Sequence, residues 1–254
     1  DGPNWPSMHS DLKWSTYKGK PVLVGRPKTG NDGVLAWFYS LILYNKVGAR
    51  AALPMLVVNG NDLWVALFGL EDYQPGTFET LDPFRPQLSA EFPADAWLAN
   101  WPVFGPKANM YENVWVKNDG SDYMRAITFG TFTMKWTAKG KPYPPDTIGE
   151  MTTMLDTSLA PSAALLFSDV KDDPVIALPM ATRITELNDP QIISTFEPGP
   201  KSGNEDLVYD QWQPNTVARA KTMGRDVVPT LLPKGLTGAF EGTTAQAKKK
   251  VKER

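Results

Sequence analysis

Cysteine is absent from the 254 residues of this chain, and histidine occurs once, as His9. The lack of cysteine excludes disulfides, thiolate metal sites and a cysteine nucleophile. A single histidine gives no support to a metal site with two histidines or to an ordinary histidine-dependent triad. The sequence therefore predicts no metal site and no cofactor.

Long hydrophobic runs and an excess of one charge are also missing. The longest apolar run, residues 34–43, is interrupted by Ser40 and is too short to cross a bilayer, so we expect no membrane contact. The net charge of −2 gives no global field that would attract a polyanion, and any nucleic-acid contact needs a local basic patch. The chain opens at Asp1 without a visible signal peptide, which leaves cytoplasmic and secreted locations open.

What is present is enough apolar surface for a sizeable core, with 42% hydrophobic and 11% aromatic residues. The 20 Gly and 23 Pro divide the chain into short elements. We expect one compact domain with a β-rich part, residues 1–120, a helical part, residues 121–254, and a basic tail at 245–254. The tail is interpreted as exposed chain, and RNA phosphates are its alternative partner.

The N-terminal part is predicted to be mostly an antiparallel sheet. Its strands are expected at residues 21–25, 34–44, 51–58 and 63–69. Asn-Gly and Asp-Gly turns separate them, which favours a meander. Residues 25–30 contain glycines, a lysine and a threonine but lack the Gly-Lys-Ser/Thr ending of a phosphate-binding loop, so they are interpreted as a hairpin turn.

The remainder of the chain is predicted to be mainly helical, which makes the fold class α+β. Helices are expected at residues 94–100, 123–138, 145–156, 160–168, 174–188 and 207–222. Pro179 lies inside one of these segments and lacks a backbone donor, so that helix should kink or start only near residue 179.

Two features of the sequence suggest a binding site. Arg183 lies on an otherwise apolar stretch, where it is either paired inside the fold or faces a ligand. Most of the nine tryptophans are expected in the core, and the alternative is a platform on which bases or sugars stack.

Taken in chain order, several segments resemble the ribosome-inactivating proteins, the RNA N-glycosidases, and in particular the single-chain cereal-seed type. The matching segments are residues 21–23, 37–41, 61–69, 101–113, 128–138, 180–184 and 208–212. Residues 180–184 correspond to the Glu-Ala-x-Arg-Phe signature of that family, with Met180 in place of the glutamate. The resemblance implies that the chain is a hydrolase and a plant-defence toxin. Such a protein inhibits protein synthesis by removing an adenine from a ribosomal RNA loop.

The same resemblance assigns roles to individual residues. Trp64 and Tyr111 would stack on the extruded adenine, and Trp212 would form the pocket wall. Arg183 would stabilise the leaving base, because its guanidinium stays charged. Glu186 is the acid near Met180 in sequence and would be either a relocated catalyst or the ion-pair partner of Arg183.

Three functions stay open from the sequence. The first is an rRNA N-glycosidase that binds an extruded adenine, with weak activity or none. The second is an inactive relative of that fold with a binding, storage or regulatory role. The third is a β-rich subunit of a larger assembly with protein partners at its aromatic and proline-rich surfaces.

Overall fold

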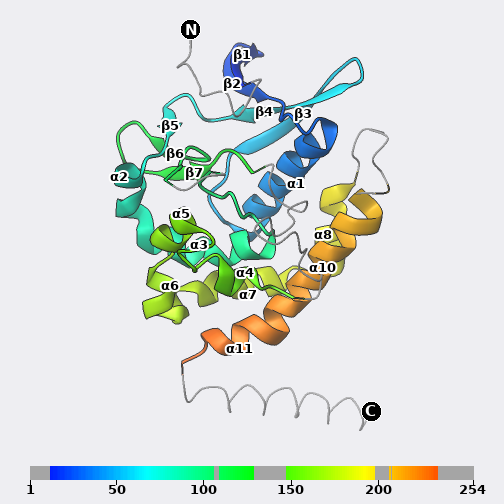
Figure 1. Cartoon of the computed structure of the whole chain (residues 1–254). Coiled ribbons are helices and arrows are strands. Elements are labelled where there is room, and N and C mark those ends of the chain that lie inside the picture. Colours follow the sequence, from blue (N-terminus) through cyan, green and yellow to red (C-terminus); the bar gives the residue numbers. More distant parts are fainter. Residues whose placement is uncertain (1–11, 106–108, 129–146, 198–205, 207, 234–254) are drawn as a thin grey trace.

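The computed structural model of the chain describes residues 12–105, 109–128, 147–197, 206 and 208–233. The predicted α+β class is confirmed: an antiparallel four-stranded sheet is followed by a mostly helical region with a small three-stranded sheet. Figure 1 shows the four-stranded sheet at one end of the molecule and the later helices at the other. His9 and the basic tail lie outside the described residues, and the division at residue 120 stays a prediction.

The two sheets are joined through the backbone. The first sheet has the order β1-β2-β4-β3 and the second has the order β5-β6-β7. Ala52 N donates to Arg125 O (2.9 Å) and Arg125 N donates to Arg50 O (3.0 Å), so the second sheet is fastened to the segment before β3. The strands are β1 (Lys13–Tyr17), β2 (Lys20–Gly25), β3 (Leu53–Asn59), β4 (Asp62–Phe68), β5 (Tyr73–Pro75), β6 (Val114–Lys117) and β7 (Tyr123–Arg125).

The described helices fall into one long early helix, a second that follows β5, and a series of short ones near the end. The α-helices are α1 (Asn31–Val47), α2 (Phe78–Leu81), α3 (Arg85–Trp97), α4 (Glu150–Thr153), α5 (Pro161–Leu166), α6 (Asp169–Asp172), α7 (Leu178–Glu186), α8 (Asp189–Phe196), α10 (Gln213–Thr222) and α11 (Val228–Leu231). Two 3₁₀ turns, η1 (Asp82–Phe84) and η2 (Pro174–Ala177), and two π-helical turns, η3 (Val208–Trp212) and η4 (Met223–Val227), connect them.

Helix α1 is the main departure from the sequence prediction, because residues 34–44 were expected to form a strand. Most of this helix is buried, and an apolar run that is buried all round fits a strand and a helix equally well by its periodicity. Gly48 carries the local signal that favours a helix. It lies in the left-handed region (φ 75°), and its N–H donates to Asn45 O (3.1 Å), which is a common way for a helix to end.

Two further predictions are wrong for related reasons. Residues 25–30 are not a hairpin turn but the link from β2 to α1, so the meander is interrupted between β2 and β3. Residues 123–125 form β7 rather than the start of a helix, because they pair with β6, and residues 129–138 lie outside the described part. In both cases pairing with distant residues overrides the local pattern.

The prediction for the segment around Pro179 is confirmed. Residues Pro174–Ala177 form the 3₁₀ turn η2, and α7 starts at Leu178 with the proline in its first turn, where the missing backbone donor costs no hydrogen bond. The helices predicted at residues 94–100, 145–156, 160–168 and 207–222 each overlap a helix of the structure, although their bounds differ.

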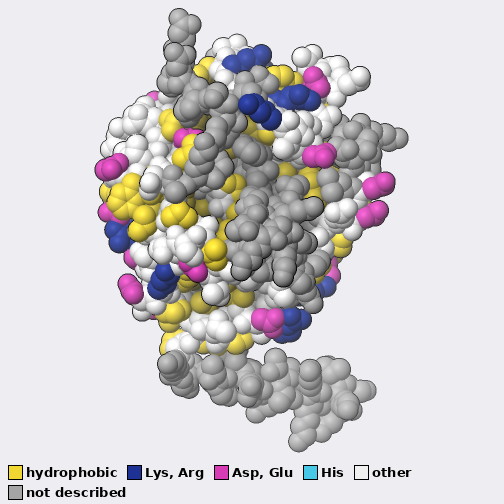
Figure 2. All heavy atoms as spheres, viewed as in Figure 1, with side chains coloured by type: hydrophobic (Ala, Val, Ile, Leu, Met, Phe, Trp, Pro, Cys, Tyr) yellow, Lys and Arg dark blue, Asp and Glu magenta, His cyan; other side chains and the backbone are white. Residues whose placement is uncertain are grey.

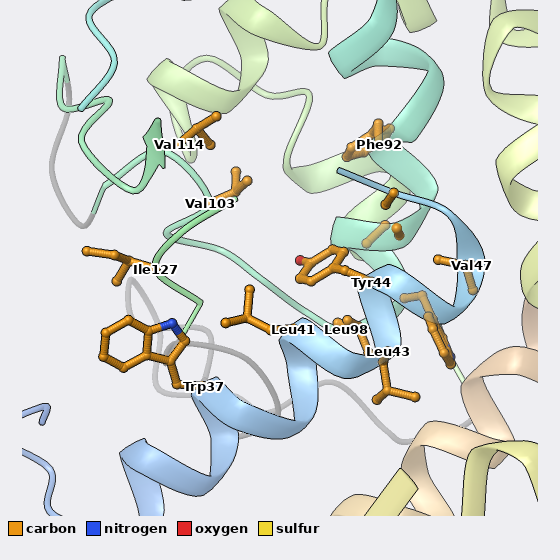
Figure 3. Packing of buried hydrophobic residues seen from close by; sticks show 14 of the residues in the cluster. Trp37, Leu41, Leu43, Tyr44, Val47, Phe92, Leu98, Val103, Val114 and Ile127 are labelled. Carbon is orange, nitrogen blue, oxygen red and sulfur yellow. The ribbon is translucent and has the colours of Figure 1, made fainter. Parts of the chain in front are cut away.

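The core lies where α1 contacts the sheet and the helical region. Leu23, Val65 and Leu67 point from the sheet toward this helix and have no exposed surface. Figure 3 shows Trp37, Leu41 and Tyr44 leaving α1 toward the segments that carry Val103 and Ile127. The helix is therefore the central element, with the sheet on one side and the chain around residues 98–128 on the other.

Candidate functional site

The side of α1 that faces residues 126–128 holds a buried polar cluster. Trp37 Nε1 donates to Ala126 O (2.8 Å), and the hydroxyls of Ser40 and Thr128 share a hydrogen bond of 2.6 Å. Ser40 also donates to Trp37 O (2.9 Å). These contacts fix the end of the segment after β7 against α1.

Asn113, which precedes β6, completes this cluster. Its carbonyl accepts from the backbone N–H groups of Ala126 (3.0 Å) and Ile127 (3.1 Å), and its Nδ2 donates to Pro102 O (2.6 Å). Its Oδ1 is buried and has no hydrogen-bond partner. We call Trp37, Ser40, Asn113 and Thr128 the neutral cluster, since none of the four side chains carries a charge.

Two glycines lie where β2 leads into α1, and Gly25 borders the neutral cluster. A Cβ at Gly25, the last residue of β2, would lie 2.5 Å from Leu12 Cδ2 and 2.7 Å from ring carbons of Trp37. A Cβ at Gly33, in the first turn of α1, would collide with Thr29 Oγ1. Neither position has room for a side chain while Trp37 and Thr29 keep their places.

A second buried cluster, three residues earlier on the same segment, is charged. Arg125 bonds Asp95 through Nη2 (2.5 Å) and Nε (3.0 Å), and it bonds Glu91 through Nη1 (2.6 Å). Arg50 reaches the other oxygen of Glu91 (2.9 Å), and Tyr44 donates to Asp95 Oδ1 (2.8 Å). We call these five residues the charged cluster.

Burial and pairing shift the pKa values within the charged cluster. Burial alone would lower the pKa of Arg125, but the charges of Asp95 and Glu91 raise it well above its ordinary value. Burial raises the pKa of Tyr44, and the charge of Asp95 raises it further. Because Arg125 and Asp95 have no exposed surface, this cluster holds α3 to β7 and does not reach a ligand.

An open pocket of about 550 Å³ lies between the start of α2, the residues before β6 and α5. Tyr111 lines it and packs against Phe78 and Phe104, with ring centroids 5.8 and 6.1 Å away. Glu79 and Glu112 also line it, and burial raises the pKa of Glu112. The described lining includes these two carboxylates and no Lys or Arg.

The other residues singled out by the sequence lie elsewhere. Arg183 and Glu186 are exposed on α7, whereas Trp212 is buried at the end of η3 with 2% of its surface exposed. Trp64 is half-buried on β4, with Lys13 Nζ 5.2 Å from the centre of its ring. Of the four residues expected to form one adenine site, only Tyr111 lines the pocket.

The described residues contain no group of three or more His, Cys, Asp or Glu side chains arranged to hold a metal ion. None of the described helices combines the length and the apolar character that a membrane crossing requires.

No protein-family model and no curated protein matches this chain. Among solved structures, the chain is similar to the crystal structure of a Helicobacter pylori proinflammatory kinase, CtkA, with a TM-score of 0.50 and 11% identity. The similarity covers 89% of this chain and 95% of the other. The chain therefore has a kinase-like fold.

This finding corrects the interpretation drawn from the sequence. The resemblance to ribosome-inactivating proteins is wrong, and with it the predicted rRNA N-glycosidase activity and the role as a plant-defence toxin. The same finding overturns the two alternatives, an inactive relative of that family and a β-rich subunit. The short segments agreed in order, but each was too short to fix a fold, and the roles of Arg183, Glu186 and Trp212 lose their basis.

Proposed function

We propose that this chain is a binding protein of kinase-like fold that does not transfer phosphate. The observation that supports this proposal most directly is the neutral cluster beside Gly25 and Gly33. Phosphoryl transfer is catalysed almost entirely by positioned charge, from lysine, carboxylates and metal ions. The described part of this region supplies an indole, two hydroxyls and an amide instead.

The strand and helix that bring charge to a kinase site have counterparts here in β2 and α1. Protein kinases carry a lysine on such a strand, and it pairs with a glutamate of the following helix and with the phosphates of ATP. In this chain Gly25 ends β2 and Gly33 lies in the first turn of α1, and the ring of Trp37 fills the space at Gly25. An indole at this position favours a function in which contacts are made by packing rather than by charge.

The metal ligands expected of a kinase fit the chain poorly. Kinases hold Mg²⁺ through the aspartate of an Asp-Phe-Gly segment and an asparagine of the catalytic loop. Residues 128–130 read Thr-Phe-Gly, and the hydroxyl of Thr128 is bonded to Ser40. Asn113 Oδ1 is an available amide oxygen, but an amide and a hydroxyl are a weak donor set for a hard dication that prefers carboxylates.

The ligand of a binding protein needs a place, and we propose the Tyr111 pocket. Tyr111 and Phe78 line this pocket with aromatic rings, and Glu79 adds an exposed carboxylate, which together suit an organic cation. Calorimetry with spermidine as the probe tests this. Tyr111→Leu should weaken binding, whereas Tyr209→Leu, at an exposed tyrosine on η3, should not. Equal binding by both variants would remove the pocket from the proposal.

Thermal unfolding with and without Mg²⁺ and ATP tests the absence of a nucleotide site. A ligand at 100 times its Kd stabilises the folded state by about 2.7 kcal/mol, which is readily seen as a rise in Tm. We expect no rise. A Mg²⁺-dependent rise that disappears in Asn113→Ala would favour the competing proposal, a phosphotransferase that uses the free Oδ1 of Asn113.

A further inference from the structure

The face of the four-stranded sheet that points away from α1 has its own chemistry. Residues two apart on a strand share a face, and opposed residues on neighbouring strands do as well. The register pairs Lys13 with Val24, Tyr17 with Lys20, and Val24 with Ala66. Since Leu23, Val65 and Leu67 form the buried inner face, the outer face carries Lys13, Tyr17, Lys20, Trp64 and Phe68. Val22 and Ala66 share this outer face and are buried between the larger side chains.

Three aromatic rings lie on this outer face. Tyr17 is 40% exposed and makes an edge contact with Phe68, with ring centroids 6.0 Å apart. Trp64 is half-buried, and its Nε1 has no hydrogen-bond partner. A buried indole N–H is normally hydrogen-bonded, as that of Trp37 is. The N–H of Trp64 lacks such a bond, so the Trp64 side chain is held in place less firmly than that of Trp37.

The charge on this face is positive. Residues 12–30 contain five basic side chains and no acidic one, although the whole chain has a net charge of −2. Arg26 is paired with Asp62 (2.8 Å), whereas Lys13, Lys18 and Lys20 are exposed. Figure 2 shows Lys and Arg side chains gathered at the end of the molecule formed by β1 and β2.

Two of these lysines lie directly over the rings. Lys13 Nζ is 5.2 Å from the centre of the Trp64 ring, and Lys18 Nζ is 5.4 Å from that of Tyr17. These contacts are weak at an exposed surface. A flat base can take the place of each ammonium group on the ring, which frees the lysine for the phosphate beside that base.

We propose that the outer face of this sheet, Lys13, Tyr17, Lys18, Lys20, Trp64 and Phe68, binds single-stranded nucleic acid. Sheets that bind single strands combine aromatic side chains, on which bases stack, with basic groups that contact the backbone. This face supplies both on one rigid four-stranded scaffold whose other side is packed on α1. The inference is independent of the absence of phosphotransfer, since it concerns the opposite side of the sheet.

Fluorescence anisotropy of a labelled oligothymidylate, titrated with the full chain at low ionic strength, tests the proposal. The double variant Lys13→Glu/Lys20→Glu should lose binding by more than about tenfold, and the slope of log K against log salt should fall by about 1.4, at about 0.7 per lost phosphate contact. Tyr17→Ala should weaken binding by about 5- to 150-fold, the range for one stacked base.

Matched variants separate this face from the rest of the surface. Lys171→Glu reverses an exposed lysine on α6, and Tyr209→Ala removes a tyrosine that is 37% exposed, close to the 40% of Tyr17. Both should bind like the parent chain. A duplex of equal length should bind more weakly than the single strand, because its bases are not available for stacking.

Three results would overturn the proposal. The first is no binding at low ionic strength. The second is binding that persists in Lys13→Glu/Lys20→Glu, which would assign it to another basic segment such as residues 248–254. The third is binding to vesicles of anionic lipid with none to the oligonucleotide, which would make the face a membrane contact. None of these results bears on ATP, so failure here leaves the proposed function untouched.

Discussion

The charged cluster at the end of β7 and the neutral cluster on the segment that follows lie next to each other, yet they use opposite chemistry. Arg125 of the first is paired with two carboxylates, whereas the second contains no charged side chain. Each cluster has one buried amide oxygen without a partner, that of Asn100 beside Tyr44 and Asp95 and that of Asn113. Ionic groups in this part of the fold therefore hold elements together. The described side chains of the neutral cluster, in contrast, are all uncharged.

The largest difference between the clusters should appear when Arg125 is replaced. Arg125→Met leaves Asp95 and Glu91 buried beside an apolar side chain, and removing one partner of a buried ion pair costs about 3–5 kcal/mol. Urea denaturation measures the loss. Arg85→Met is the control, because its pair with Asp82 is partly exposed and is worth about 1 kcal/mol or less. Equal losses in the two variants would show that the charged cluster is not a structural centre.

The packing beside the neutral cluster should be the next most sensitive feature. Gly25→Ala introduces a Cβ 2.7 Å from the ring of Trp37, and overpacking of a core costs about 1–3 kcal/mol. The Cβ would also lie 2.5 Å from Leu12 Cδ2, but this atom ends a flexible side chain that can move aside, whereas the ring is rigid. The same change in a Trp37→Leu background should cost clearly less, because the ring is gone. If the cost of the alanine is the same in both backgrounds, Trp37 does not fill the space at Gly25.

Within the neutral cluster a single hydrogen bond should matter less. Thr128→Val and Ser40→Ala each break the 2.6 Å contact between the two hydroxyls, and we expect a loss of about 1 kcal/mol for each. Because both changes remove one bond, the double variant should lose less than the sum. Both hydroxyls also contact Trp37 O, so additive losses in urea denaturation would mean that the bond between the two hydroxyls does not contribute to stability.

The smallest effect is expected at alkaline pH and belongs to the charged cluster. The raised pKa of Tyr44 means that its phenol keeps its proton in the folded state at a pH where the unfolded chain has lost it. The contribution of Tyr44 to the free energy of unfolding is therefore fully present below pH about 10, and it declines as pH rises further. Tyr44→Phe should lose less stability than the parent between neutral pH and pH about 11 in urea denaturation, and an equal or steeper loss would contradict the shift.

The sequence predicted the α+β class correctly, because its polar turns and the proline-punctuated helices are local signals. It misassigned α1 because residues 34–44 are apolar on every side and have no period that distinguishes helix from strand. Gly48, in the left-handed region at the end of this run, is the local signal that favours a helix.

The candidate site could not be predicted in the same way. Trp37 and Thr128 are 91 residues apart and look like ordinary core residues, and only the fold brings α1 against the segment after β7. Thr128 lies inside a segment whose local pattern predicts a helix over residues 123–138. Its meaning as the first residue of a Thr-Phe-Gly segment depends on a kinase-like fold, which the local pattern did not reveal.

We propose that this kinase-like fold does not transfer phosphate, and one measurement tests this directly. The chain is incubated with ATP labelled in its γ-phosphate and with Mg²⁺ or Mn²⁺, and label is followed in the chain itself, in a generic protein substrate and in free phosphate. We expect no transfer above a sample without protein. Metal-dependent transfer that is lost in Asn113→Ala would contradict the claim.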